Sequence, residues 1–397
     1  MSEEIHFLII AAGLMAFALV ARLVTRAVLT APIVMLAAGA GLSYAGAAPL
    51  SLQLHHLHLF AEVALVVLLF LDAARTDVRG LLSKHVWPLR AIVLGMPLSF
   101  LLGTAAFWVV LPDAQIGLVM LLAALMVPTD AALGKSLVEN EALPKRTRRA
   151  LVVESGLNDG IALPAILICA ALAAHAPAEH GGWGLFVASQ LLIGPIVGAA
   201  LGVAMARVML WAQSQGYTSE LYEGIATLAL AACAYLAATS VGGNGLIAAF
   251  CCGAGFGYVA AGRCSFVYEF LDGDGQLLSW AAFFLIGALL VPEALSALTL
   301  PMALAILVSL CLVRPASILA AFTGSDADMR TKLLLGWFGP RGLATALFAL
   351  ILADRLPGDM GQYVVDFAAN AVWISAVLHG VSVIPITRAF ARAPRSP

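Results

Sequence analysis

Long runs of apolar residues alternate with short polar segments along the whole chain. Each run holds about 18 to 25 residues, the length that an α-helix needs to cross a hydrocarbon layer ~30 Å thick. We therefore expect an all-α polytopic membrane protein. The pattern predicts thirteen transmembrane helices, at residues 5–26, 31–48, 57–73, 87–111, 114–137, 150–173, 183–209, 220–240, 244–261, 275–291, 301–322, 331–353 and 362–390.

The composition supports this assignment. Hydrophobic residues make up 62% of the 397 positions and charged residues 11%, whereas soluble domains carry about 25% charge. We expect one membrane domain over residues 1–397, with the lipid bilayer around it and no soluble domain. The chain has no large basic region, which excludes nucleic-acid binding.

The basic residues predict the orientation in the membrane. If the amino terminus lies outside, eighteen of the 21 Lys and Arg residues fall in inside segments and only Arg355 falls outside, as the positive-inside rule requires. Glu3 and Glu4 precede the first run, where a secretory signal would carry positive charge. We expect a multi-pass protein of a cell inner (plasma) membrane with its carboxy terminus in the cytoplasm.

Three acids lie inside apolar runs, namely Asp130, Glu154 and Asp159. A charge at this depth costs about 2.5–3.5 kcal/mol even on insertion scales, so each is a functional candidate. Pro128 removes a backbone donor just before Asp130, which predicts a break in the helix beside an ion site. The alternative is a kinked helix in which Asp130 caps its own second half.

The densest polar cluster inside any run is Glu154-Ser155-Gly156-Leu157-Asn158-Asp159. Glu154 and Asn158 share a helix face because they are four residues apart. With Thr129 and Asp130 opposite, the cluster makes an oxygen-rich site of the kind that hard cations prefer. The alternative is a structural polar network that holds helices together.

The second half of the chain carries matching features. Gly339-Pro340-Arg341-Gly342 interrupts an apolar run, and Arg314 lies one run earlier. Interrupted helices at corresponding places in two halves indicate a transporter site between inverted repeats. If the seventh helix is a linker, two inverted six-helix repeats follow, with crossed discontinuous helices 5 and 12.

Other polar signals are interpreted as structural. We expect His55, His56 and His58 in a loop, the Asp272-to-Gly275 segment in a solvated turn, and Glu62 and Asp72 at the membrane interfaces. His379 is expected to be mainly a packing contact. Loose dinucleotide fingerprints at Gly243 and Gly255 follow no strand and indicate close helix packing.

Taken in order, Pro128-Thr129-Asp130, the Glu154-to-Asp159 box and Gly339-Pro340-Arg341-Gly342 resemble the monovalent cation:proton antiporter-1 family. That family includes bacterial Na⁺/H⁺ antiporters and the animal sodium/proton exchangers. The resemblance covers nearly the whole chain. One departure is Ala131, where many relatives have proline.

The resemblance implies roles for individual residues. Asp159 would be the shared cation and proton carrier, and Asp130, Thr129 and Ser155 would help it bind Na⁺. Glu154 would pair with Arg314, Arg341 would balance the ends of the broken helices, and Asn158 would hold its helix against the break. No enzyme activity and no cofactor is expected, since Na⁺ and H⁺ are transported ions.

The resemblance also implies a homodimer in which a core moves against a scaffold. The corresponding segments are residues 1–111, mainly scaffold with the start of the core; 112–173, core helices with the ion site; 183–209, a linker helix; 220–300, scaffold helices; and 301–390, core helices.

Electrogenic relatives have a second aspartate where this chain has Asn158. The sequence therefore predicts electroneutral one-for-one exchange of Na⁺, or of Li⁺ or K⁺, for H⁺. The alternative is a sodium-coupled symporter of an organic anion on a related inverted-repeat fold.

Overall fold

The computed structural model describes residues 30–46, 54–75, 86–130, 143–174, 183–260 and 265–392, together with Ala12, Met15, Leu19 and Leu133. For residues 54–57, 183–187, 190, 265–274, 384 and 387–392 it describes the backbone alone. Every regular element in these ranges is helical. The first predicted span, residues 5–26, lies outside them except for three helical positions.

The other predicted spans are present as helices within the described ranges, so the all-helical fold class is confirmed. They are α2 (Ala31–Tyr44), α3 (Leu54–Arg75), α5 (Val86–Arg90) with η1 (Ala91–Gly95) and α6 (Met96–Val110), α7 (Ile116–Leu125), α9 (Lys145–Ala173), α10 (Trp183–Ser214), α11 (Glu220–Ser240), α12 (Gly245–Ala260), α13 (Ser265–Leu285) with η2 (Ile286–Leu290) and α14 (Val291–Ser296), α15 (Leu300–Val308) with η3 (Ser309–Val313) and α16 (Arg314–Ala321), α17 (Met329–Trp337), α18 (Leu343–Ala353), and α19 (Met360–Arg392).

Three spans contain a single π-helical turn, labelled η1, η2 and η3. Each turn is followed within two residues by a proline, namely Pro97, Pro292 and Pro315. A proline clashes with the carbonyl four residues earlier in an α-helix, and that residue lies in the π-helical turn in all three cases. The wider turn lets the helix continue past the proline.

Several helices are longer than the apolar runs that predicted them. α3 begins at Leu54, so His55, His56 and His58 lie in its first turns instead of a loop. α13 begins at Ser265, so residues 272–275 are helical and the expected solvated turn is wrong. An apolar run measures the hydrocarbon thickness, whereas a helix continues into the polar headgroup region.

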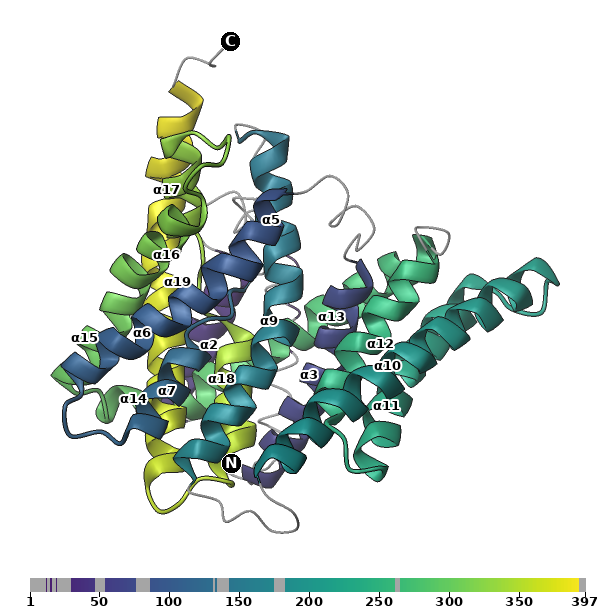
Figure 1. The fold of residues 1–397 in the computed structure, drawn as a ribbon, viewed down its shortest axis with the longest axis horizontal. Coiled ribbons are helices and arrows are strands. Elements are labelled where there is room, and N and C mark those ends of the chain that lie inside the picture. The colour runs from purple at the N-terminus through teal and green to yellow at the C-terminus, as the bar shows by residue number, and fades with distance from the viewer. Residues whose placement is uncertain are drawn as a thin grey trace.

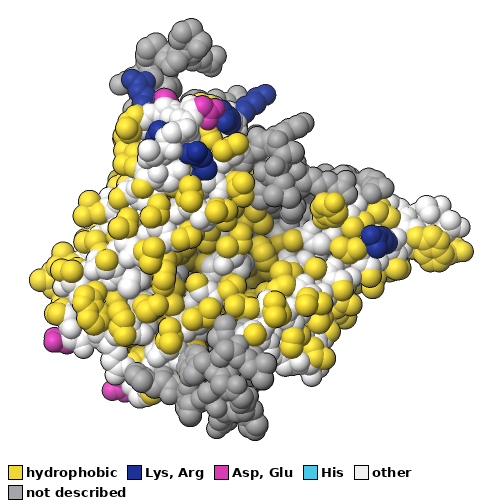
Figure 2. Space-filling model, viewed as in Figure 1, with side chains coloured by type: hydrophobic (Ala, Val, Ile, Leu, Met, Phe, Trp, Pro, Cys, Tyr) yellow, Lys and Arg dark blue, Asp and Glu magenta, His cyan; other side chains and the backbone are white. Residues whose placement is uncertain are grey.

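Seven helices in the described part are long and apolar enough to cross a membrane, and four shorter apolar helices accompany them. Hydrophobic side chains cover most of the middle of the face in Figure 2, while most Lys and Arg side chains lie at the end near the carboxy terminus. The chain is thus a multi-pass membrane protein.

The helices form two groups on either side of a central set (Figure 1). α10, α11 and α12 lie on the right of the view, and α15, α16, α17 and α19 lie on the left. α9 and α18 lie between them, and α7 lies beside α19 on the left. α7 and α18 adjoin the interrupted segments.

The right-hand group is held together by glycines that bring helix backbones into direct contact. Gly253 and Gly257 of α12 face the backbone carbonyls of Phe70 and Ala74 in α3, and a Cβ added to either glycine would lie 2.1 or 2.2 Å from that oxygen. Residues four apart share one helix face, so this is a small-residue contact of the kind that joins membrane helices.

The opposite side of α12 makes an equivalent contact with α10. Gly198 and Gly202 of α10 lie against the carbonyls of Ala248 and Cys252, where an added Cβ would be 2.1 Å from each oxygen. We call α3, α12 and α10 with these four glycines the glycine stack. The interpretation of the α12 glycines as close helix packing is confirmed.

Candidate functional site

The first break interrupts the fifth predicted span. α7 ends at Leu125, and residues 127–130 continue without helical structure. Val127 and Thr129 are each 5% exposed, so the unwound backbone lies inside the protein. Non-helical backbone at this depth needs partners within the protein, because lipid offers none.

The second break interrupts the twelfth span. α17 ends at Trp337, residues 338–342 are not helical, and α18 begins at Leu343. Arg341 is 1% exposed. The predicted discontinuous helices 5 and 12 are therefore both present.

The two breaks cross and bond to each other. The backbone N–H of Asp130 donates to the carbonyl of Pro340 at 2.8 Å. The Asp130 carboxylate accepts the backbone N–H of Leu343, also at 2.8 Å. Asp130 thus caps the first turn of α18, which belongs to the other broken helix, whereas the second half of its own span lies largely outside the described residues. An acid at a helix N-terminus is favoured by the helix dipole.

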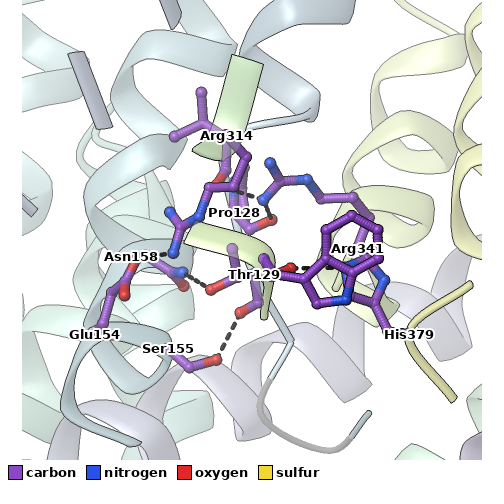
Figure 3. A network of polar contacts seen from close by, with 10 residues as sticks. Pro128, Thr129, Glu154, Ser155, Asn158, Arg314, Arg341 and His379 are labelled. Carbon is purple, nitrogen blue, oxygen red and sulfur yellow. Dashed lines mark hydrogen bonds and ion pairs between the residues drawn. The ribbon is translucent and has the colours of Figure 1, made fainter. Parts of the chain in front are cut away.

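Arg341 supplies donors for the carbonyls that the first break leaves free. Its guanidinium donates to the carbonyls of Val127 at 3.0 Å and Pro128 at 2.9 Å (Figure 3). Hydrogen bonds from a charged donor are about twice as strong as neutral ones. Arg341 therefore stabilises the break that follows α7, as the resemblance implied.

The glycines of the second break allow this close approach. An added Cβ on Gly342 would lie 1.8 Å from a carboxylate oxygen of Asp130, and one on Gly339 would lie 2.7 Å from Nε of Arg314. Side chains at these positions would push the two breaks apart.

Helix α9 lies against the crossing and holds Thr129. The Ser155 hydroxyl donates to the Thr129 carbonyl at 2.6 Å, and the Asn158 amide donates to the Thr129 hydroxyl (Figure 3). Asn158 is fully buried, which agrees with its expected role of holding α9 against the break.

One turn earlier, Glu154 forms an ion pair with Arg314 of α16, and each residue is 2% exposed. This is the pair that the resemblance implied. We call residues 127–130 and 338–342, together with Arg314 and the side chains of Glu154, Ser155, Asn158 and Asp159, the polar crossing.

Four buried polar atoms of the polar crossing have no hydrogen-bond partner among the described residues: Oδ1 of Asp159, Oδ1 of Asn158, and Nε of Arg314 and of Arg341. The two oxygens are acceptors, and a buried acceptor without a donor is costly. A bound cation can satisfy either oxygen, and a proton can satisfy the Asp159 carboxylate.

The charged groups that act on Asp159 are Asp72, Asp130 and Arg341. Asp72 of α3 was expected at a membrane interface; its side chain is half-buried, and its depth in the membrane stays a prediction. Leu65 and Leu69 on the same face of α3 are each 2% exposed, so the face points into the protein. Helical periodicity relative to these leucines is the sequence signal that places Asp72 inside.

Two other polar side chains of α3 also have partners in the protein. Nδ1 of His58 lies 2.9 Å from the Asp354 carboxylate, and the Tyr235 hydroxyl donates to Glu62. His58 therefore joins α3 to the turn after α18. The side chains of His55 and His56 lie outside the described residues.

Within the described residues, no group of three or more His, Cys, Asp and Glu side chains is arranged to hold a metal ion. The oxygens at the polar crossing come instead from carboxylates, hydroxyls, an amide and backbone carbonyls. This mixed oxygen set suits a hard cation.

A membrane protein in which two interrupted helices cross next to an unsatisfied carboxylate has the architecture of an inverted-repeat secondary transporter. Residues 13–389 match the family described as "Sodium/hydrogen exchanger, transmembrane". The chain belongs to this family.

The sequence identity to individual relatives is low. A K⁺/H⁺ antiporter NhaP of Alkalimonas amylolytica is 26% identical over 336 residues, which cover 83% of this chain and 57% of the relative. A probable Na⁺/H⁺ antiporter of Schizosaccharomyces pombe is 26% identical over 312 residues, covering 74% of this chain and 40% of the relative. The chain spans about half the length of the curated relatives it matches.

The fold resembles that of a solved sodium proton antiporter, MjNhaP1 of Methanocaldococcus jannaschii. A structure at pH 8 superposes with a TM-score of 0.76 at 18% identity, covering 99% of this chain and 100% of that one. An electron-microscopy structure of the same antiporter gives a TM-score of 0.78 at 17% identity and full coverage of both chains.

Proposed function

We propose that this protein is a secondary active antiporter that exchanges Na⁺, or another monovalent cation such as Li⁺ or K⁺, for H⁺ across the membrane. The observation that carries the proposal is the buried Asp159 oxygen without a partner beside two crossed helix breaks. The names of relatives, which mention K⁺/H⁺ and Na⁺/H⁺ antiport, support it.

In this proposal Asp159 and Asp130 provide carboxylates for the cation, while Thr129 and Ser155 provide neutral oxygens. Asp72 adds negative field from α3. Glu154, Asn158, Arg314 and Arg341 support the site, because their hydrogen bonds and ion pair hold the backbone that carries these ligands.

Exchange follows from competition for one carboxylate. A cation and a proton cannot occupy Asp159 together, so the release of one on either side of the membrane lets the other bind. The proposed motion carries a core, residues 112–173 and 301–390, past a scaffold made of most of 1–111 with 220–300, with 183–209 as the linker.

We propose that the exchange is electroneutral, with one cation for one proton. Asn158 is neutral, so only Asp159 binds a cation in one direction of transport and a proton in the other. The net charge that moves through the membrane is then the same in both directions. One extra charge would couple transport to voltage by ~2.3 kcal/mol per 100 mV.

We also propose that the protein is a homodimer in a cell inner membrane, with the amino terminus outside and the carboxy terminus in the cytoplasm. The Lys and Arg side chains near the carboxy-terminal end of the molecule support this orientation (Figure 2), because cytoplasmic loops carry the excess of positive charge.

A sodium-coupled symporter of an organic anion is not favoured, since the named relatives are antiporters.

The test is exchange by the full chain reconstituted in lipid vesicles. A pH gradient is imposed, and a lumenal pH dye reports proton movement when Na⁺, Li⁺, K⁺ or choline is added. We expect a response to Na⁺ but not to choline, of equal size with the membrane potential clamped or free. A response that scales with the clamped potential would contradict electroneutral exchange.

Asp159→Asn is the matched variant, because it removes the charge and keeps the size of the side chain. We expect it to fold and to show no exchange with any cation. Exchange at the wild-type rate in this variant would reject Asp159 as the carrier, and no response from the wild type to any cation would reject antiport.

A further inference from the structure

His379 of α19 lies beside the second break and contacts its first end. The side chain is 2% exposed. Its Nε2 lies 2.9 Å from the carbonyl of Trp337, the last residue of α17. Its Nδ1 lies 2.8 Å from the carbonyl of Ser375 and 3.1 Å from the hydroxyl of the same residue, and this hydroxyl accepts the backbone N–H of Arg341 at 2.7 Å.

The Trp337 carbonyl can only accept, so the bond at Nε2 needs a proton there. Nδ1 faces both the hydroxyl and the carbonyl of Ser375. With one proton on the ring, Nδ1 accepts from the Ser375 hydroxyl, which in turn accepts from Arg341. The result is a continuous chain in which the donors run from the Arg341 backbone N–H through Ser375 and His379 to the Trp337 carbonyl.

The Trp337 carbonyl accepts the backbone N–H of Gly339 at 2.9 Å, and His379 gives it a second donor where the chain unwinds. The rings of Trp337 and Phe338 pack against the imidazole, with centroids 5.8 and 6.3 Å away. One side chain of α19 therefore holds the beginning of the break, and through Ser375 it holds the end of the break as well.

We propose that His379 is a positioning residue for the ion site and acts through residues 338–342. By fixing both ends of this segment to α19, it places the Arg341 guanidinium at the Val127 and Pro128 carbonyls and the Pro340 carbonyl at the Asp130 N–H. Asp130 and Thr129 then face Asp159 in the geometry that binds the cation. This inference rests on the proposed function.

A packing role alone would not need Nε2 to meet the Trp337 carbonyl at the start of the break, or Nδ1 to meet the residue that bonds to Arg341. A buried polar ring is costly unless it is hydrogen-bonded, and a leucine would fill a similar volume without that cost. The hydrogen bonds, and not the volume, are therefore the feature to test.

The test compares three variants in the vesicle assay with Na⁺ as the cation. His379→Leu removes both bonds, and His379→Gln keeps an amide donor that can reach the Trp337 carbonyl. Ser375→Ala removes the link to Arg341 without changing the imidazole. We expect His379→Leu and Ser375→Ala to raise the KM for Na⁺ about tenfold, which corresponds to the loss of one buried hydrogen bond, with little change in the maximal rate.

Rescue and a control complete the design. We expect His379→Gln to restore the KM to within about threefold of wild type. Ser317→Ala is the control, because this buried hydroxyl donates to the Val313 carbonyl in its own helix turn; its KM should equal that of wild type. An unchanged KM in both His379→Leu and Ser375→Ala would overturn the inference, as would equal damage from the Gln and Leu variants.

Hydrogen exchange of the backbone gives a reading that does not depend on transport. Residues 338–342 should exchange faster in His379→Leu than in wild type, while α12 should not change. If the wild type moves no cation, the proposed function fails, and hydrogen exchange still decides whether His379 holds the break. Equal exchange of residues 338–342 in both proteins would overturn the inference.

Discussion

The glycine stack and the polar crossing hold helices together in opposite ways. In the stack, four glycines bring the backbones of α3, α12 and α10 into contact through shape alone. In the polar crossing, charges and hydrogen bonds join residues more than 200 positions apart, such as Arg341 with Val127. Close packing of helix backbones does not depend on polar side chains. The polar crossing does, and there a carboxylate oxygen of Asp159 has no hydrogen-bond partner among the described residues.

In the proposed function, this difference separates the part that must keep one arrangement from the part that binds a cation and a proton in turn. Close packing tolerates little displacement, because even small voids and overlaps are costly. The polar crossing contains groups whose partners can be replaced by a cation or a proton. The following predictions test this contrast, from the largest expected effect to the smallest.

The buried ion pair gives the largest expected change in stability. Arg314→Met leaves Glu154 charged and unpaired at 2% exposure, which should lower the free energy of unfolding by about 3–5 kcal/mol. The double variant Arg314→Met/Glu154→Met should recover most of this loss, because both charges are gone. Thermal unfolding in detergent measures both. Equal losses in the single and double variants would show that the charge is not the cause.

The glycine stack should respond to volume alone. Gly253→Ala places a methyl group 2.1 Å from the Phe70 carbonyl and should cost about 1–3 kcal/mol of unfolding free energy. Gly255→Ala in the same helix is the control, since its nearest neighbour is 3.1 Å away. Thermal unfolding compares the two variants. We expect the folded fraction of Gly253→Ala to exchange cations with wild-type KM, and a raised KM would break the contrast between the two regions.

Within the polar crossing, a single hydroxyl should affect cation binding more than folding. Ser155→Ala removes the donor to the Thr129 carbonyl, and the loss of about 1 kcal/mol should raise the KM for Na⁺ about fivefold. Ser317→Ala is the control, because this fully buried hydroxyl bonds only to the Val313 carbonyl in its own helix turn. Equal KM values for the two variants would argue against Ser155 as a ligand-positioning group.

The smallest effect concerns the polar end of the molecule, outside the spans. Asp326, in the turn between α16 and α17, accepts hydrogen bonds from Arg146 and, at 2.6 Å, from the Trp87 indole. The bonds from Arg146 and then Trp87 hold the pKa of the Asp326 carboxyl below its usual range. A lowered pKa in the folded state contributes stability at neutral pH that is lost as the pH falls through the folded-state value.

Asp326→Asn should therefore lower the unfolding midpoint slightly at pH 7, and the difference from wild type should shrink as the pH falls below about 4. The effect is small because the Asp326 side chain is 62% exposed and solvent screens the pair. Unfolding midpoints measured from pH 3 to 8 show this trend. A difference that grows towards acid pH would contradict the sign.

The sequence was sufficient to predict the breaks and the acids, because proline, glycine and buried charge act locally. Pro128 and the Gly339-to-Gly342 segment mark the interruptions, and Glu154 and Asp159 stand out in apolar surroundings. The span order followed from the apolar runs in the same way.

Contacts between distant segments were harder to predict. That Asp130 caps α18 depends on how the two breaks cross, which no local pattern contains. Asp72 resembles an interfacial acid until Leu65 and Leu69 show which face of α3 is buried. His379 resembles a packing residue until Trp337 and Ser375 are found on either side of its ring.

The bonds of Arg341 also have a consequence for how the protein is made. The carbonyls of Val127 and Pro128 receive their donor from a residue 213 or 214 positions later in the chain. A ribosome delivers the fifth helix long before the twelfth, and lipid cannot satisfy the open backbone in the meantime. During synthesis this segment must therefore stay with water or with the insertion machinery, and the first half of the protein reaches its final form only when the second half arrives.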